Sequence, residues 1–190
     1  TGAHEIDINA LTVYGAQELN ISLSYSSDAT TKGIIGKGWS FNYEMSVAEI
    51  ADNPDTEENE NTIKVFVTPS KYREYVLKED SQNQYKCVEE KRRTDVLTKN
   101  EDGTYTLSCN NETTYTFSAE GKLIKEETKQ GFAYDIVYSD TSIKVIDSLT
   151  GKYVELKVNK SGMINEITNG DKRSCFLEQD EKGCLISITD

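Results

Sequence analysis

The side chains that could do chemistry in this sequence are its carboxylates, its four cysteines and its single histidine, His4. Two carboxylates that flank a glycosidic bond can hydrolyse it, and 33 of the 190 residues are Asp or Glu. Such an abundance is more typical of a solvated acidic surface. His4 lies in a segment that we expect to fray, which makes it a poor general base. The sequence contains no nucleophile elbow, phosphate-binding loop or pair of metal-binding histidines, so we predict no catalytic residues and no enzyme activity.

The cysteines are widely spaced and form no C-x-x-C pair. This spacing, with His4 far away in sequence, does not indicate a zinc site, and we expect neither a metal nor a cofactor. An even number of cysteines permits two disulfides in three pairings, whereas scattered cysteines are also common as small buried apolar residues. We favour free buried thiols, and the disulfide alternative stays open. The four positions are Cys87, Cys109, Cys175 and Cys184.

Two charged segments have the composition of binding sites but not the spacing. The acidic segment 52–61 contains no glycine, which an EF-hand calcium loop requires at its centre. We interpret this segment as a solvated loop. The basic cluster Lys91-Arg92-Arg93 directly follows two glutamates, so an exposed strand edge explains it better than a nucleic-acid site.

The overall composition limits the partners. With 21 Lys and Arg against 33 Asp and Glu, the formal net charge is −12, which disfavours nucleic acid and anionic membrane surfaces. No apolar run approaches the roughly 20 residues of a membrane-spanning helix, so we expect no membrane insertion. Eleven Tyr and twelve Gly stand beside only two Pro and one Trp, a composition that favours strands and turns.

Alternation of apolar and polar residues predicts where the strands lie. It is clearest over 19–26, where Leu, Ile, Leu and Tyr alternate with polar residues, and it returns with aromatic residues over 39–44. A further strand is expected over 63–67. The segments 105–109 and 114–117 flank a short polar turn and predict a hairpin.

A short phrase recurs in the second half of the chain. Each copy is a strand end, a polar turn, a Gly, one variable residue and a Leu or Ile, and the three glycines are 41 and 21 residues apart. A second set, Gly131, Gly151 and Gly170, falls between them. Internal repeats of about 20 residues predict consecutive β-hairpins, with Gly at the turn position of positive φ. The three phrases end in Gly121-x-Leu123, Gly162-x-Ile164 and Gly183-x-Leu185.

These motifs resemble RHS/YD-repeat proteins. The segment 23–27 (Leu-Ser-Tyr-Ser-Ser) followed by 36–44 (Gly-Lys-Gly-Trp-Ser-Phe-Asn-Tyr-Glu) is similar to the family's opening region, and Thr1-Gly2 with the strand beginning at Ile6 matches its lead-in. The tail, 183–190, fits the repeat core Gly-x-Leu-x-x-Ile-x-Asp, and 162–169 fits it with Asn for Asp. The opening triplet has Ser where the family usually has Asn.

The resemblance implies an all-β fold, an antiparallel sheet built from consecutive hairpins that forms a segment of a larger β-shell or ribbon. Residues 1–100 would be the opening region and 101–190 the degenerate repeats. Family members are large bacterial surface or secreted polypeptides whose shell can enclose a C-terminal toxin. The residues expected to carry this structure are Tyr25, Ser27, Gly36, Gly38, Trp39, Tyr43, Gly121, Leu123, Gly162, Ile164, Gly183, Leu185 and Asp190.

The function that follows from the resemblance is a non-catalytic structural scaffold outside the cell or on its surface. Its partners would be the remaining repeats and the C-terminal domain of the parent polypeptide. The alternative is an extracellular carbohydrate-binding module, with exposed aromatic rings on the sheet stacking on a cell-surface glycan. Packing of the sheet face explains the many Tyr residues better than sugar stacking does, and we expect Trp39 to be a core anchor.

Overall fold

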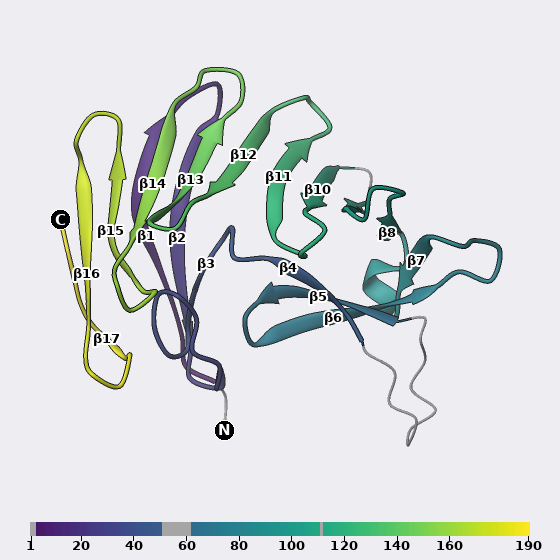
Figure 1. Cartoon of the computed structure of the whole chain (residues 1–190), viewed down its shortest axis with the longest axis horizontal. Coiled ribbons are helices and arrows are strands. Elements are labelled where there is room, and N and C mark those ends of the chain that lie inside the picture. Colours follow the sequence, from purple (N-terminus) through teal and green to yellow (C-terminus); the bar gives the residue numbers. More distant parts are fainter. Residues whose placement is uncertain (1–2, 51–61, 111) are drawn as a thin grey trace. The chain divides into compact units, whose positions relative to one another are not determined.

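The protein is built almost entirely of β-strands. The computed structural model describes residues 3–50, 62–110 and 112–190, so the acidic segment 52–61, Thr1-Gly2 and Asn111 of the expected 105–117 hairpin turn lie outside the described residues. Over the described ranges the one helical element is a 3₁₀ helix, Glu90–Arg92, labelled η1. The expected all-β fold of consecutive antiparallel hairpins is confirmed (Figure 1).

The chain divides into two compact units. The first contains Thr1–Glu44, Thr68–Ser70 and Phe132–Asp190, and the second contains Met45–Val67 and Lys71–Gly131. The division of the sequence at residue 100 was made by motif, and it stays a prediction.

The first unit contains two packed sheets. Strands β1 (Glu5–Tyr14), β2 (Glu18–Ser26) and β3 (Trp39–Phe41) form an antiparallel sheet in that order. The alternation of β2 places Leu19, Ile21 and Leu23 on one face, where all three are fully buried. This apolar face explains why the sheet packs against other strands of the same unit, since β1 contacts β14, β15 and β16 and β2 contacts β14.

The second sheet of this unit consists of six consecutive antiparallel strands. Each pairs with the next in the chain, as successive hairpins do (Figure 1). Their inward residues, including Val145, Val154, Leu156 and Ile167, are fully buried. The strands are β12 (Ala133–Tyr138), β13 (Ser142–Asp147), β14 (Tyr153–Val158), β15 (Ile164–Asn169), β16 (Ser174–Gln179) and β17 (Leu185–Thr189).

The second unit is also a run of antiparallel strands in chain order, and it has a core of its own. Val65, Tyr75, Leu97, Leu107 and Phe117 are fully buried in it. The strands are β4 (Ser46–Glu49), β5 (Thr62–Thr68), β6 (Lys71–Leu77), β7 (Gln84–Cys87), β8 (Val96–Lys99), β9 (Tyr105–Cys109), β10 (Thr113–Phe117) and β11 (Leu123–Thr128). The predicted strand at 63–67 and the predicted hairpin of 105–117 are therefore confirmed.

The recurring phrase folds into one type of hairpin turn. In the turn Asn159–Met163, the N–H of Asn159 donates to the carbonyl of Met163 (2.8 Å) and the N–H of Gly162 donates to the carbonyl of Asn159 (2.9 Å). Gly162 has φ +78°, and the strand register shifts at Lys157/Val158 beside the turn. This is a three-residue loop closed by a bulge, in which the left-handed position favours glycine. The turns at Gly103, Gly121 and Gly183 repeat the same pair of hydrogen bonds.

In two of these turns the opening residue caps the turn with its side chain. The Asn159 Oδ1 accepts the N–H groups of Ser161 (2.9 Å) and Met163 (3.1 Å). Asp180 Oδ1 does the same for the two equivalent residues of its own turn. Asn and Asp are favoured there because a short side-chain acceptor reaches the turn's own N–H groups. The sequence signal is therefore Asn, Asp or Ser three residues before the Gly.

Three sequence predictions are wrong in detail. The aromatic strand expected over 39–44 ends at Phe41 and is followed by a turn. Gly170 does not take a positive φ; the left-handed residue of that turn is Lys172, at φ +63°, two positions later. The turn runs from Asn169 to Arg173, and the Asn169 Oδ1 accepts the Arg173 N–H (3.0 Å). The basic cluster is not a strand edge, because Arg92 ends η1 and holds its guanidinium 3.6 Å from the Asp95 carboxylate.

Candidate functional site

The loop between β2 and β3 is bound to the repeat hairpins of the same unit. The Ile164 N–H donates to the Ile34 carbonyl (2.8 Å), and the Lys37 N–H donates to the Gly183 carbonyl (2.9 Å). Gln179 Nε2 donates to the carbonyls of Ile35 (3.1 Å) and Ile164 (2.7 Å). We call residues 28–38 the docked loop. Most of the hydrogen bonds that join this loop to the repeat hairpins run from backbone to backbone. The contact therefore depends on a close approach of the loop to those hairpins.

Gly36 permits that close approach. A Cβ placed on Gly36 would lie 3.2 Å from the Leu185 N and 3.3 Å from the Leu185 Cβ, which is tighter than ordinary contact. Gly36 has no positive φ, so its small size, and not its conformational freedom, is what the site uses. Four residues that the sequence singled out separately are thus brought together here: Gly36, Ile164, Gly183 and Leu185.

Aromatic residues at the end of the docked loop hold the start of β3. Tyr25 and Trp39 are opposite each other in the β2–β3 pair, with ring centroids 5.3 Å apart. Gly38, at φ +79°, lies under the Tyr25 ring, where a Cβ would be 2.8 Å from a ring carbon. Trp39 is half-buried, and the deep anchors are Phe41 and Tyr43, which are 3% and 4% exposed.

A half-buried carboxylate, that of Glu44, supports the docked loop. Glu44 accepts hydrogen bonds from the N–H groups of Ile34 and Phe41, both at 3.3 Å, and a Cβ on Gly33 would be 3.1 Å from its Oε1. Burial raises the pKa of Glu44 to about 7, because these two long hydrogen bonds offset only part of the desolvation. The charge of Glu44 also acts on Tyr138. Burial is the larger cause and this charge the smaller one, and together they raise the pKa of Tyr138 to about 12.

The remaining predicted residues have structural partners elsewhere. Tyr43 packs edge-on against Tyr134, with centroids 6.2 Å apart, and Ser27 exchanges hydrogen bonds with His4, both at 3.0 Å. In the second unit, the Val47 N–H donates to the Gly121 carbonyl (2.8 Å). The other three are Leu123, fully buried in the second unit, and Gly162 and Asp190, which are exposed.

The second unit contains a buried polar row that the sequence did not reveal. Tyr75 is opposite Cys87, and the register of the next two strands continues the row through Asp95 to Cys109. Asp95 is fully buried, and its Oδ1 accepts the Asn110 N–H (3.2 Å). Burial, and then the charge of Asp95, raise the pKa of Cys109 to about 11. A thiol kept protonated in this way is a weak nucleophile, so the row is better suited to structure than to covalent chemistry.

All four cysteines lie in the described part of the chain and are free. The favoured sequence interpretation was free buried thiols. Cys87 and Cys175 are buried, and Cys109 and Cys184 are half-buried. Among the described residues, no cluster of three or more His, Cys, Asp or Glu side chains is arranged to hold a metal ion. Within those residues, no helix is long and apolar enough to cross a membrane.

Comparison with known proteins finds one similarity, over the first third of the chain. Residues 1–66 match the family DUF6531, described as a domain of unknown function. The match includes β1 to β3 and the whole docked loop, and it ends before the repeat hairpins on which that loop lies. No curated protein matches the chain.

The residues that sequence reasoning missed are those whose role depends on distant partners. Glu44, Gln179 and Ile34 belong to this group. Glu44 is the last residue of the aromatic segment 39–44, which is a weak signal for burial, and Gln179 stands where the other repeats have an apolar strand end. Neither signal says which backbone groups the side chain contacts.

Proposed function

We propose that this chain is a non-catalytic structural scaffold, the N-terminal portion of a large RHS/YD-repeat polypeptide of a bacterial surface or secreted protein. In this proposal the repeats continue as a β-shell around a C-terminal toxin or effector domain. The partners are the further repeats and that C-terminal domain, and the location is outside the cell or on its surface.

The observation that carries the proposal is the attachment of the docked loop to the repeats. The loop contains Gly36-Lys37-Gly38 of the opening motif, and its backbone bonds to Ile164 and Gly183, which are the motif positions of two separate repeats. The opening motif and the repeat motif are thus complementary surfaces of one assembly. A motif whose residues contact the backbone of another motif supports a role in holding hairpins together, and such a role needs no reacting group.

The uniform turns also support a scaffold. Four turns share one hydrogen-bond pattern, and each adds a strand next to its predecessor in the chain. A single hairpin is marginally stable in water, so each gains stability from its neighbours. Adding hairpins in this way widens the sheet and requires no reactive side chain at any position.

The test uses the parent polypeptide. Its reading frame is expected to encode many more repeats and a variable C-terminal domain. Limited proteolysis of the purified parent should leave that domain protected, whereas a Gly36→Val parent, in which the docked loop is displaced, should expose it faster. A parent frame without further repeats, or a C-terminal domain cleaved equally fast in both proteins, would contradict the proposal.

A carbohydrate-binding module remains the second candidate, and Tyr14 is the observation that favours it. Its side chain is 68% exposed on β1. Tyr72 is 46% exposed, but its ring already faces the Lys64 Nζ at 4.3 Å and packs against Phe66. Loss of binding on a glycan array after Tyr14→Ala, and not after Tyr72→Ala, would favour this candidate over a purely structural role.

A further inference from the structure

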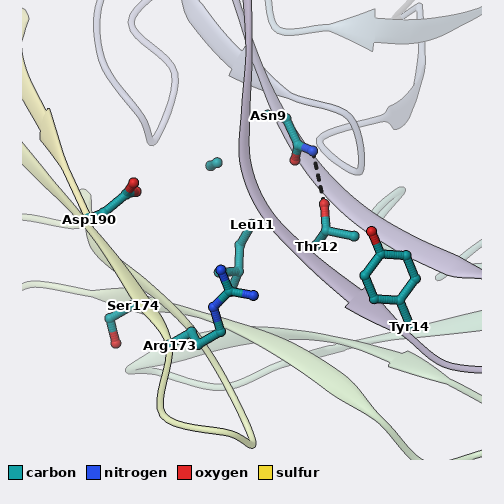
Figure 2. Close-up of a pocket in the computed structure, with 8 residues that line it drawn as sticks. Asn9, Leu11, Thr12, Tyr14, Arg173, Ser174 and Asp190 are labelled. Carbon is teal, nitrogen blue, oxygen red and sulfur yellow. Dashed lines mark hydrogen bonds between the residues drawn. The ribbon is translucent and has the colours of Figure 1, made fainter.

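A polar groove lies beside Tyr14 in the first unit. It has a volume of about 360 Å³ and runs between the second half of β1 and the turn that joins β15 to β16 (Figure 2). This volume is within the range of small-molecule sites, about 300–1,000 Å³. The side chains with hydrogen-bonding groups along it are Asn9, Thr12, Tyr14, Arg173, Ser174 and Asp190.

Arg173 distinguishes this groove from two further hollows of similar size. In those hollows the lysine is paired with a carboxylate: Lys157 with Glu166 at 2.9 Å, and Lys129 with Glu112 at 3.6 Å. Over the described ranges, the Arg173 guanidinium has neither an ion pair nor a hydrogen bond. Figure 2 shows it directed into the groove, and the turn Asn169–Arg173 holds its backbone. A guanidinium binds a carboxylate through two parallel hydrogen bonds, so the groove presents an unused carboxylate site.

Asn9 is oriented on the β1 side of the groove. Its Nδ2 donates to the Thr12 Oγ1 (2.9 Å), and the Thr12 hydroxyl donates to the Asn20 Oδ1 (2.6 Å). This chain of hydrogen bonds fixes the amide, so that the Asn9 Oδ1 is left as an acceptor (Figure 2). The Asp190 carboxylate is a second acceptor on the other side of the groove. Two acceptors beside a carboxylate site suit a ligand that has hydroxyl groups.

Besides the guanidinium and the two acceptors, the groove has an exposed aromatic ring, that of Tyr14, at one end. The β1 backbone at Tyr14 is fixed, because its carbonyl accepts a hydrogen bond from the Lys152 Nζ (2.6 Å). An exposed ring on a fixed strand is a stacking surface with little entropy to lose, and sugar rings have apolar C–H faces that suit it.

We propose that this groove binds a sugar acid, with its carboxylate on Arg173, its hydroxyls on Asn9 and Asp190, and its ring against Tyr14. The proposal is independent of the scaffold function. It also differs from sugar stacking on a sheet face, because it requires the guanidinium and therefore predicts selection of an acidic over a neutral sugar.

The experiment is a titration of the whole chain with D-glucuronate and, separately, with D-glucose, followed by NMR chemical shifts or calorimetry. Because the groove is open to water, we expect saturable glucuronate binding with Kd on the order of 1 mM and at least about tenfold weaker binding of glucose. Arg173→Ala should weaken glucuronate binding about tenfold or more. Arg173→Lys keeps the positive charge but lacks the paired N–H donors of the guanidinium, so its affinity for glucuronate should lie between those of the unchanged protein and Arg173→Ala.

Arg93→Ala is the matched control, since Arg93 is an exposed arginine in the second unit and pairs with Glu90 at 3.5 Å. Unchanged binding in this variant, with loss in Arg173→Ala, supports the groove. Absence of saturable glucuronate binding overturns the proposal, as does equal weakening by both arginine variants. If glucose and glucuronate bind equally and depend on Tyr14 alone, the acidic selection is wrong while a neutral carbohydrate module survives. Tyr14→Ala provides a second variant should Arg173→Ala not fold.

Discussion

Two carboxylates in the first unit, the half-buried Glu44 and the buried Asp147, show how local partners decide the direction of a pKa shift. Burial alone raises the pKa of both. For Glu44 it dominates. For Asp147, which is 2% exposed, hydrogen bonds from Ala16 (2.6 Å), Leu149 and Thr150 outweigh burial and lower the pKa. Asp147 accepts more hydrogen bonds from N–H groups than Glu44 does, and they are shorter. Short amide hydrogen bonds stabilise the charged form of a carboxylate, so the pKa of Asp147 is lowered.

Glu44→Gln is expected to remove a pH dependence of stability. An acid whose pKa is about 7 in the folded state and near 4.5 in the unfolded state binds its proton more tightly when folded. The free energy of unfolding should therefore be highest below about pH 4.5 and fall, by up to about 3 kcal/mol, as pH rises to about 7. Urea unfolding of both proteins across this window measures the difference.

The matched control for that experiment is Glu181→Gln, an exposed glutamate in the turn before β17. It should follow the pH profile of the unchanged protein. A Glu44→Gln variant that kept the full decrease in stability between about pH 4.5 and 7 would show that another group is responsible.

At the scale of the elements, glycines that share one turn geometry have different surroundings. Gly121 and Gly162 have φ of +80° and +78° in equivalent turns. A Cβ on Gly162 would meet nothing within 4 Å, whereas on Gly121 it would lie 2.0 Å from the Val47 carbonyl oxygen. The turn alone requires glycine for its φ, and the strand beside Gly121 requires it for space as well.

Gly162→Ala and Gly121→Ala separate these two requirements. Gly162→Ala should cost about 1 kcal/mol of unfolding free energy, the penalty of a left-handed alanine. Gly121→Ala must also displace the Val47 backbone, and we expect a loss of at least about 3 kcal/mol. Chemical denaturation of the two variants gives the comparison, and equal losses would contradict the role of the Val47 contact.

The docked loop can be released without changing a turn. Gly36→Val places a branched side chain against Leu185, so the loop should lift and the Ile164 N–H should lose its acceptor, the Ile34 carbonyl. Hydrogen exchange at Ile164 is expected to accelerate by about tenfold or more. Gly170→Val is the control, because its nearest contact is a Tyr153 ring carbon at 3.7 Å. Equal protection of Ile164 in both variants would mean that the loop is held by other contacts.

At the scale of the whole molecule, stability rests on packed sheets without covalent cross-links. Each unit has a continuous apolar core of its own, and the four free cysteines are buried or half-buried. Burial raises the pKa of Cys175 as well as that of Cys109, with a further contribution from the charges of Asp190 and Asp95 respectively. Both thiols are therefore mostly protonated, and slow to react, at neutral pH.

Reducing agent is accordingly expected to leave the melting temperature unchanged. Unfolding without reductant, followed by alkylation, should modify all four cysteines, whereas alkylation of the folded protein at neutral pH should be slow at Cys87, Cys109 and Cys175. Mass spectrometry after digestion identifies the modified positions. Fewer than four reactive thiols in the unfolded, unreduced protein would demonstrate a disulfide.

The strands and most of the turns follow from local sequence. Alternation over 19–26 predicts β2 because its period of two places Leu19, Ile21 and Leu23 on one face, and the Gly of each repeat predicts its turn because few other residues tolerate positive φ. Gly170 shows the limit of this rule. The left-handed position of that turn is Lys172, since the Asn169 side chain and the register of β15 and β16 set the turn, and the presence of a nearby glycine does not.

What local patterns could not supply is which distant residues meet. Gly36 and Leu185 are separated by most of the chain, and their contact exists because the apolar face of β2 packs over the repeat strands and leaves the docked loop at their ends. The same packing half-buries Glu44 and places Arg173 across the groove from β1. Periodicity reports the environment of one segment at a time, whereas these contacts arise from the stacking of two sheets. The sequence alone therefore determined the repeats and their turns, whereas the environment of Glu44, the docked loop and the groove were decided only by the packing of the sheets.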